Sequence, residues 1–179
     1  MRESRSCSTP ARRGRDSAGE AAIALLHSIY DVTTDQTSSY EGEVDRLLWL
    51  GCEAFGLSEG FLTRIEGTDG DGTQTIVRAR GSHEQLQPGA PCPLSEAYCR
   101  KTIGTDGLLA VSNAVEAGWE RDPAYEASEL GCYIGRKGVV DGERYGTLCF
   151  ASSRPGSGRR RPPNSDSTIS WSNPSSRRS

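Results

Sequence analysis

Cysteine is the residue type in this sequence with the greatest potential for chemistry. The six copies are Cys7, Cys52, Cys92, Cys99, Cys132 and Cys149. No two of them form a C-x-x-C pair, and neither of the two histidines lies near a cysteine in the sequence. The spacing therefore gives no zinc signal. In a reducing compartment these side chains are expected to be free thiols, several of them buried as small hydrophobic groups.

Three other patterns have simpler explanations than a chemical site. His27 lies beside the apolar stripe of a predicted helix, where it is expected to pack or to be exposed. As the phospho-acceptor of a histidine kinase it would need further domains, which do not fit in 179 residues. The acids of GTDGDGT lack the ligand count and trailing glutamate of an EF-hand, so this segment is predicted to be a turn. Arg136 and Lys137 are expected to face solvent, with an anionic ligand as the alternative.

Two amphipathic helices are predicted in the first third of the chain. Ser17 and Glu20 have capping-box spacing and precede apolar residues at helical spacing. The second helix covers YEGEVDRLLWLGCEAFG, with acids in its first turn and Gly56 as its stop. Its predicted apolar stripe consists of Val44, Leu47, Leu48, Gly51 and Phe55.

The rest of the pattern predicts an antiparallel sheet. The predicted strands are residues 61–66, 74–80 and 108–113, followed by a hairpin over 132–153 with Asp141-Gly142 as its turn. Short helices are expected at 94–103 and 123–130, and a proline-containing loop at 81–93. Together these elements indicate an α+β fold. We expect a central antiparallel sheet of about five to six strands, with long helices on one face and loops and short helices on the other.

The charge is divided unevenly along the chain. Residues 19–151 carry 21 acidic and 10 basic side chains, a net charge of −11, whereas the two ends together carry +8. An acidic domain with little lysine suits a protein that works in high salt, where self-repulsion is screened. The alternative is an ordinary acidic cytosolic domain. The acidic middle argues against a nucleic-acid partner. No apolar run approaches 18 residues, so neither a membrane span nor a secretory signal is expected, and the predicted location is cytoplasmic.

Four segments of the sequence carry a family resemblance. They are VDRLLWLGCEAFGLSEGFLTRIEG, PCPLSEAYCRKTI, LLAVSNA and the closing CYIGRKGVVDGERYGTLCFA. Together they resemble a GAF domain over residues 41–152, and they are similar to GAF modules in sensor kinases and transcription regulators of salt-loving archaea. The resemblance implies a non-catalytic sensory or regulatory domain that binds a small molecule, or pairs as a homodimer or with a signalling partner through its long helices. No residue is diagnostic of a particular cofactor.

The resemblance also implies where a ligand would bind. Pockets of this family lie between the sheet and its covering loops, which here places the pocket among residues 82–103 and 113–131. The candidate lining residues are Tyr98, Cys99, Trp119 and Tyr125. The alternative is that these side chains only pack against the sheet.

A thiol enzyme is the second function that the resemblance suggests. Free methionine sulfoxide reductases resemble GAF domains with three thiols around the pocket, and Cys92, Cys99 and Cys132 lie in comparable segments. Such a reaction needs a cysteine of low pKa and a second thiol within disulfide reach. The spacing of Cys92 and Cys99 departs from the pattern of that family.

The closing hairpin decides which cysteines share a face of the sheet. A two-residue loop at Asp141-Gly142 would place Val140 opposite Glu143, Cys132 opposite Ala151 and Cys149 opposite Ile134. Cys132 and Cys149 would then lie on one face. A three-residue loop would put them on opposite faces.

The two ends of the chain lack a packing pattern. Residues 1–16 are expected to be a disordered basic tail, 17–40 a helix and linker, and 153–179 a disordered tail rich in Arg, Ser and Pro. A GAF domain normally continues from its last hairpin into a helix, which this tail does not predict. One hypothesis is a shifted reading frame near residue 153, which would leave a truncated, inactive fragment of a sensor kinase or regulator. The other is a genuine disordered tail.

Overall fold

The computed structural model describes residues 13–67, 71–89, 91–153 and 170–171. The chain divides into two compact units, Met1–Ser38 and Ser39–Ser179. The first contains helix α1, Arg13–Thr34. This helix begins one turn before Ser17, the position that the sequence indicated as its cap. Residues 1–12, 154–169 and 172–179, on which most of the predicted tails fall, lie outside the described residues.

Helix α2, Tyr40–Phe55, opens the second unit with the caps that its sequence favours. The Ser39 hydroxyl accepts a hydrogen bond from the Gly42 N–H at 3.2 Å, which satisfies one of the free donors of the first turn. Gly56 ends the helix in the left-handed conformation, with φ of 66°. The end predicted from the sequence is therefore confirmed.

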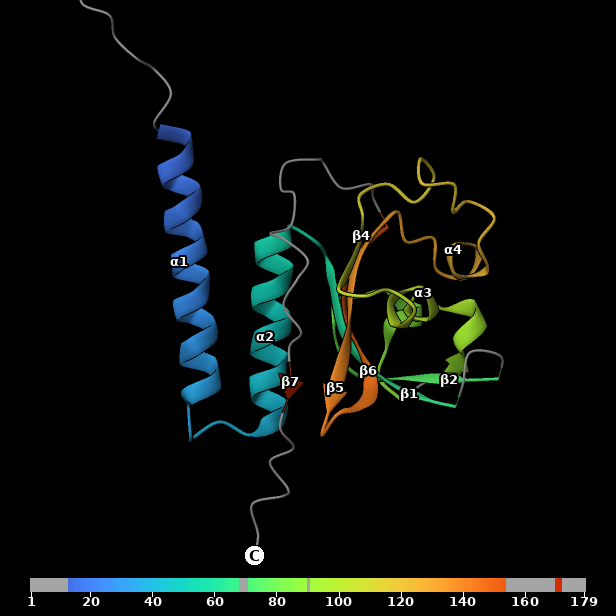
Figure 1. Cartoon of the computed structure of the whole chain (residues 1–179), viewed down its shortest axis with the longest axis horizontal. Coiled ribbons are helices and arrows are strands. Elements are labelled where there is room, and N and C mark those ends of the chain that lie inside the picture. Colours follow the sequence, from blue (N-terminus) through green and yellow to red (C-terminus); the bar gives the residue numbers. More distant parts are fainter. Residues whose placement is uncertain (1–12, 68–70, 90, 154–169, 172–179) are drawn as a thin grey trace, which may run out of the picture. The chain divides into compact units, whose positions relative to one another are not determined.

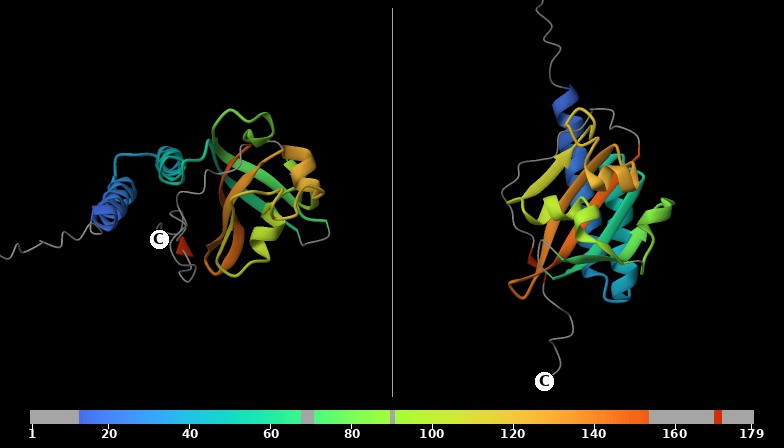
Figure 2. Two further views of the ribbon diagram at one scale, coloured as in Figure 1. Left: turned by 90° about the horizontal axis from the view of Figure 1, so that it is seen from above. Right: turned by 90° about the vertical axis from the view of Figure 1, so that its right-hand side faces the viewer.

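A single mixed sheet forms the centre of this unit, with the order β3-β2-β1-β6-β5-β4 and a further strand, β7, beside β5 (Figures 1 and 2). The strands are β1 Glu59–Glu66, β2 Thr73–Arg80, β3 Pro91–Pro93, β4 Leu108–Val111, β5 Cys132–Val140, β6 Glu143–Ser152 and β7 Ser170–Trp171. The first six pair antiparallel, as the sequence predicts, and β7 pairs parallel with β5.

The two faces of the sheet carry different coverings (Figure 1). Helix α2 packs against β1, β2 and β6, where Val44, Leu48 and Cys52 form a buried cluster with Phe150. The other face is covered by two short α-helices and two 3-10 turns. These are α3 Cys99–Ile103, α4 Pro123–Ser128, η1 Glu84–Leu86 and η2 Leu94–Glu96. This arrangement confirms the predicted α+β fold class.

The segment predicted as a loop over 81–93 contains a strand that its prolines concealed. Pro91–Pro93 form β3, which pairs with Thr73–Thr75 of β2. β3 is the outermost strand of the sheet, the position at which proline, which has no backbone N–H to donate, is tolerated.

The register of the last hairpin differs from the prediction although its two-residue turn is present. Val140 pairs with Glu143 as expected, but the register shifts between Gly138 and Val139. The extra residue is Tyr145 on β6, which has no partner in the ladder. Beyond this bulge Cys132 pairs with Ser152 rather than Ala151, and Cys149 with Gly135 rather than Ile134. Cys132 and Cys149 therefore lie on opposite faces of the sheet.

Candidate ligand-binding site

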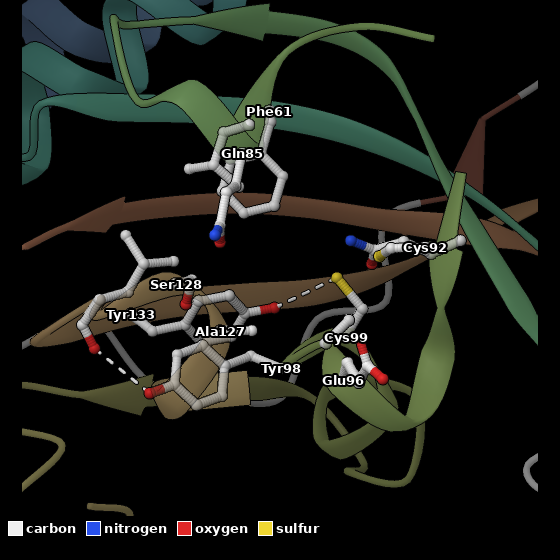
Figure 3. A pocket seen from close by; sticks show the side chains of 13 residues that line it. Phe61, Gln85, Cys92, Glu96, Tyr98, Cys99, Ala127, Ser128 and Tyr133 are labelled. Atoms are coloured by element: carbon white, nitrogen blue, oxygen red, sulfur yellow. Dashed lines mark hydrogen bonds between the residues drawn. The ribbon is translucent and has the colours of Figure 1, made fainter. Parts of the chain in front are cut away.

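A cavity of about 300 Å³ lies between the sheet and the segments that cover the face opposite α2. Three strands contribute its floor, through Phe61, Gln74 and Tyr133. The covering segments contribute the remaining lining residues, which are Gln85, Leu86, Cys92, Glu96, Ala97, Tyr98, Cys99, Ala127, Ser128 and Leu130. In Figure 3 Phe61 and Gln85 lie on one side of the cavity, and Tyr98 and Cys99 on the other.

The structure brings some of the sequence-predicted residues to this cavity and not others. Tyr98, Cys99 and Cys92 line it. Trp119 and Tyr125 pack behind the wall as partly buried members of the same core cluster. The ring of Trp119 lies 5.0 Å from that of Tyr98, and the Lys101 ammonium lies 4.7 Å above the indole. These two aromatic residues therefore support the wall without lining the cavity.

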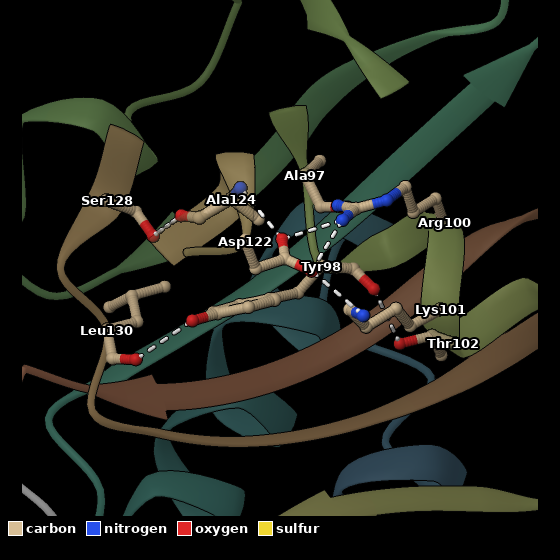
Figure 4. A network of polar contacts seen from close by, with 9 residues as sticks. All are labelled: Ala97, Tyr98, Arg100, Lys101, Thr102, Asp122, Ala124, Ser128 and Leu130. Carbon is tan, nitrogen blue, oxygen red and sulfur yellow. Dashed lines mark hydrogen bonds and ion pairs between the residues drawn. The ribbon is translucent and has the colours of Figure 1, made fainter. Parts of the chain in front are cut away.

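Tyr98 is fixed in the wall by both its ring and its hydroxyl. Its ring also contacts the Tyr133 ring, with centroids 5.2 Å apart. Its hydroxyl donates to the Leu130 carbonyl at 3.2 Å (Figure 4). Burial raises the pKa of Tyr98, so the phenol stays protonated and remains a donor.

An ion-pair network anchors the covering segments to one another (Figure 4). The Asp122 carboxylate lies 2.6 Å from a guanidinium nitrogen of Arg100 and 2.8 Å from the Lys101 ammonium. It also accepts the Ala124 N–H at 2.9 Å, as the cap of α4. Burial alone raises the pKa of Asp122, but the hydrogen bonds from Arg100 and Lys101 outweigh it and lower the pKa to about 2. This carboxylate joins α3 to α4.

A buried group of two thiols and four hydroxyls lies behind the wall at Cys99. The Cys99 and Cys149 sulfurs are 3.9 Å apart. Thr147 donates to Cys99 at 3.1 Å and accepts from Cys149 at 3.1 Å. The Tyr133 hydroxyl lies 3.0 Å from the Cys149 sulfur and 2.7 Å from the Thr102 hydroxyl, while Thr63 hydrogen-bonds Thr147 at 2.7 Å.

The two thiols of this group differ in acidity. The hydrogen bond from Cys149 lowers the pKa of Cys99 despite its burial. Burial, reinforced by the hydrogen bond to Cys99, raises the pKa of Cys149 well above its ordinary value. Of the pair, Cys99 therefore loses its proton first, and it is the member that reaches the cavity.

The three cysteines proposed for a thiol enzyme do not gather at one place. Cys92 and Cys99 both line the cavity. Cys132 is buried on the opposite face of the sheet from Cys149, where its thiol donates to the Ser152 carbonyl at 3.7 Å. Among the described residues no group of three metal-ligating side chains lies close enough to hold an ion. No described helix is long and apolar enough to cross a membrane.

Comparison with solved structures identifies the fold. The GAF domain of an Acinetobacter phosphoenolpyruvate-protein phosphotransferase matches with a TM-score of 0.55 and 12% identity, covering 74% of this chain and 78% of that one. The corresponding GAF domain from Coxiella burnetii also matches with a TM-score of 0.55 and 12% identity, over 75% and 80% of the two chains. The chain has a GAF-like fold.

A third match with this GAF-like fold is an enzyme. The free methionine-R-sulfoxide reductase of Neisseria meningitidis has a TM-score of 0.54 and 16% identity, covering 76% of this chain and 78% of that one. No family model matches the chain, and no curated protein matches it significantly.

Several residues of the GAF-like cavity were missed by sequence reasoning. Phe61, Gln74 and Tyr133 lie on strands, whereas the candidates were sought in loops and short helices. Gln74 had a readable signal. It shares the inward phase of β2 with Ile76, so a polar residue occupies a buried position of an alternating strand. The role of Cys149 had no such signal, because it depends on the bulge at Tyr145.

Proposed function

We propose that this chain is a non-catalytic sensory or regulatory module that binds a small molecule in the cavity between β1, β2, β5 and the covering segments. The observation that supports this function is the cavity itself. Its volume of about 300 Å³ is at the lower end of the range for ligand pockets. Aromatic and apolar side chains form most of its wall, with few polar groups among them.

The output of such a module would be a population shift transmitted through the sheet. Adjacent residues of β6 pack on opposite faces of the sheet. Cys149 belongs to the core cluster on the cavity side, and Phe150 belongs to the cluster under α2. A ligand that favours one position of β6 would thereby favour one packing of α2.

Pairing with a second copy is the proposed second part of this function. Helix α1 exposes Ile23, Leu26 and Tyr30, whose spacing places them on one helical face. Light scattering coupled to size-exclusion chromatography tests this. Leu26→Glu is expected to give a monomer, and Ala24→Glu, on a different face of α1, is expected to retain the dimer. A monomeric wild-type chain would end this part of the proposal.

Native mass spectrometry of the full chain, purified from its own host, tests the sensory function. We expect a retained small molecule in the wild type and its loss in Ala127→Trp, which adds bulk at a lining residue. Ala117→Trp is the matched control, because Ala117 is exposed and does not line the cavity. Equal retention by both variants would contradict binding at this site.

A thiol-dependent reductase is the alternative, and one observation favours it. Cys99 reaches the cavity and the sulfur of Cys149 lies 3.9 Å from its own, so Cys149, and not Cys132, would be the second thiol. The Cys99 thiolate would attack the sulfur of a sulfoxide. Protonation of the sulfoxide oxygen and its transfer to the Cys99 sulfur would release the sulfide and leave Cys99 as a sulfenic acid. The Cys149 thiol would then displace water and form a disulfide, which an external dithiol reduces.

Reduction of free methionine sulfoxide with dithiothreitol separates the two functions. The sensory function predicts no turnover by the wild type. Turnover that is lost in Cys99→Ser and kept in Cys52→Ser, whose thiol is buried under α2, would establish the reductase.

A further inference from the structure

Gln74 is a buried polar side chain with an unused hydrogen-bond acceptor at the cavity. It lies on β2 with 5% of its surface exposed. Its side chain hydrogen-bonds the Cys92 thiol, yet its Oε1 atom has no partner among the described residues. Leaving such an acceptor unpaired in an apolar environment costs free energy, because the oxygen loses its hydrogen bonds to water and gains none in return. A group that donates to this oxygen would recover that free energy.

The surroundings of this oxygen restrict the charge of a ligand. The buried part of the wall consists of Phe61, Tyr98, Tyr133, Cys99 and aliphatic side chains. None of the lining residues carries a positive charge, and Glu96 at the exposed edge repels an anion. A cation would lose its hydration in the interior without a buried carboxylate to replace it. The wall therefore favours a neutral molecule.

The polar groups of the wall also restrict the direction of hydrogen bonding. The Tyr98 hydroxyl already donates to the Leu130 carbonyl, and the Ser128 hydroxyl donates to the Ala124 carbonyl at 2.6 Å. Both donors are occupied, whereas Gln74 Oε1 is an unoccupied acceptor. The ligand must therefore supply the donor.

We propose that the cavity binds a small neutral molecule with an aromatic or aliphatic body and one N–H or O–H group, which donates to Gln74 Oε1. This proposal rests on the sensory function proposed above and names the chemical class of its ligand. The rings of Phe61, Tyr98 and Tyr133 contact the body of the molecule. A volume of about 300 Å³ limits it to the size of one or two rings.

Matched pairs of probes that differ only in the donor test this proposal. The pairs are indole and 1-methylindole, phenol and anisole, and benzyl alcohol and benzyl methyl ether. Their affinities for the full chain are measured by ligand-observed NMR and calorimetry. In the wild type we expect at least one donor to bind about tenfold more tightly than its methylated partner.

Two variants assign that preference to a residue. Gln74→Met removes the acceptor and keeps an unbranched side chain. The two members of each probe pair are then expected to bind with about equal affinity. Gln87→Met makes the same change at an exposed residue outside the cavity and is expected to keep the preference. Near-UV circular dichroism verifies the fold of each variant, and Gln74→Leu replaces Gln74→Met if the latter does not fold.

The outcomes separate this proposal from the function on which it rests. Equal affinity within every pair, or a donor preference that survives in Gln74→Met, would overturn the donor proposal and leave a small-molecule cavity. Equal affinity within every pair would also mean that water satisfies Gln74 Oε1 as well as a ligand does. Absence of binding by all six probes up to about 1 mM would overturn the proposed class entirely. If the native chain nevertheless retains a molecule in the mass-spectrometry experiment, the sensory function stands without this ligand class.

Discussion

The Thr63 and Thr147 hydroxyls form a buried polar pair that connects β1, β6 and the thiols. Their oxygens are 2.7 Å apart, and both side chains are completely buried. Thr147 also links Cys99 to Cys149. Because each of these hydroxyls forms hydrogen bonds with more than one group, removing one of them leaves several groups without a hydrogen-bond partner.

Thr147→Val is therefore expected to destabilise the fold although it preserves the shape of the side chain. The loss leaves Thr63 without its side-chain partner and should lower the free energy of unfolding by about 1–3 kcal/mol. Urea unfolding followed by circular dichroism measures the change. Thr75→Val, at a half-buried position of β2, is the control and should change stability by less than about 0.5 kcal/mol. Equal losses of stability in Thr147→Val and Thr75→Val would show that the Thr63–Thr147 pair has no special role in stability.

Asp122 gives the stability of the domain a defined dependence on pH. Its pKa is about 2 in the folded chain, below the ordinary value of 3.8. A depressed pKa means that the folded state binds the proton more weakly than the unfolded state. Its contribution is therefore complete above about pH 4 and is lost as the pH falls toward 2.

Asp122→Asn should remove this part of the acid sensitivity. At pH 6 we expect a loss of about 1–2 kcal/mol in the free energy of unfolding, which narrows as the pH approaches 2. Asp106→Asn is the matched control, because Asp106 pairs with Lys137 but is fully exposed. Thermal melts at pH 2 to 6 measure both. A constant difference between wild type and Asp122→Asn across this range would contradict the assignment.

At the scale of elements, α2 makes a close contact with the sheet at Gly51. A Cβ atom at this position would lie 2.1 Å from the ring of Phe150, which itself packs on Phe55 with centroids 5.2 Å apart. The apolar stripe predicted from the sequence included Gly51. The glycine therefore marks the contact, because only a residue without a side chain lets the helix approach the ring.

Gly51→Ala is expected to lower the free energy of unfolding by about 1–3 kcal/mol, although alanine is the better helix former. Phe150→Leu should relieve part of this loss in the double variant, which a double-mutant cycle measures. Gly19→Ala in α1, where nothing lies within 4 Å, should instead be neutral or stabilising. Additive effects of Gly51→Ala and Phe150→Leu would show that the ring does not limit the helix.

The elements that sequence reasoning predicted are those whose signals are local. Gly56 ends α2 by its own chemistry, and Asp141-Gly142 forms the turn of the hairpin. Strand β3 was missed because prolines argue against a strand unless an edge position is known. The cavity borders the segments in which sequence reasoning sought a pocket, but its strand residues depend on pairing between distant segments.

At the scale of the whole molecule, the charge distribution predicts a response to salt. Residues 19–151 carry a net charge of −11, so mutual repulsion opposes the folded state at low ionic strength. We expect the thermal midpoint to rise when KCl increases from about 0.1 to 1 M, because the Debye length falls from about 10 to 3 Å. Sucrose at matched osmolality is the control. A midpoint that is flat or falls in KCl would contradict an adaptation to salt.

The bulge at Tyr145 has a consequence for how this protein could change over generations. Without Tyr145, Arg144 would be followed directly by Gly146, and the pairs Val139–Arg144 and Gly138–Gly146 would succeed each other as in a regular ladder. The pairs beyond the bulge would stay as they are, so Tyr133 would keep its face of the sheet. A single lost codon at Tyr145 would therefore spare the receptor wall, whereas a lost codon further along β6 would disturb pairing with both neighbouring strands.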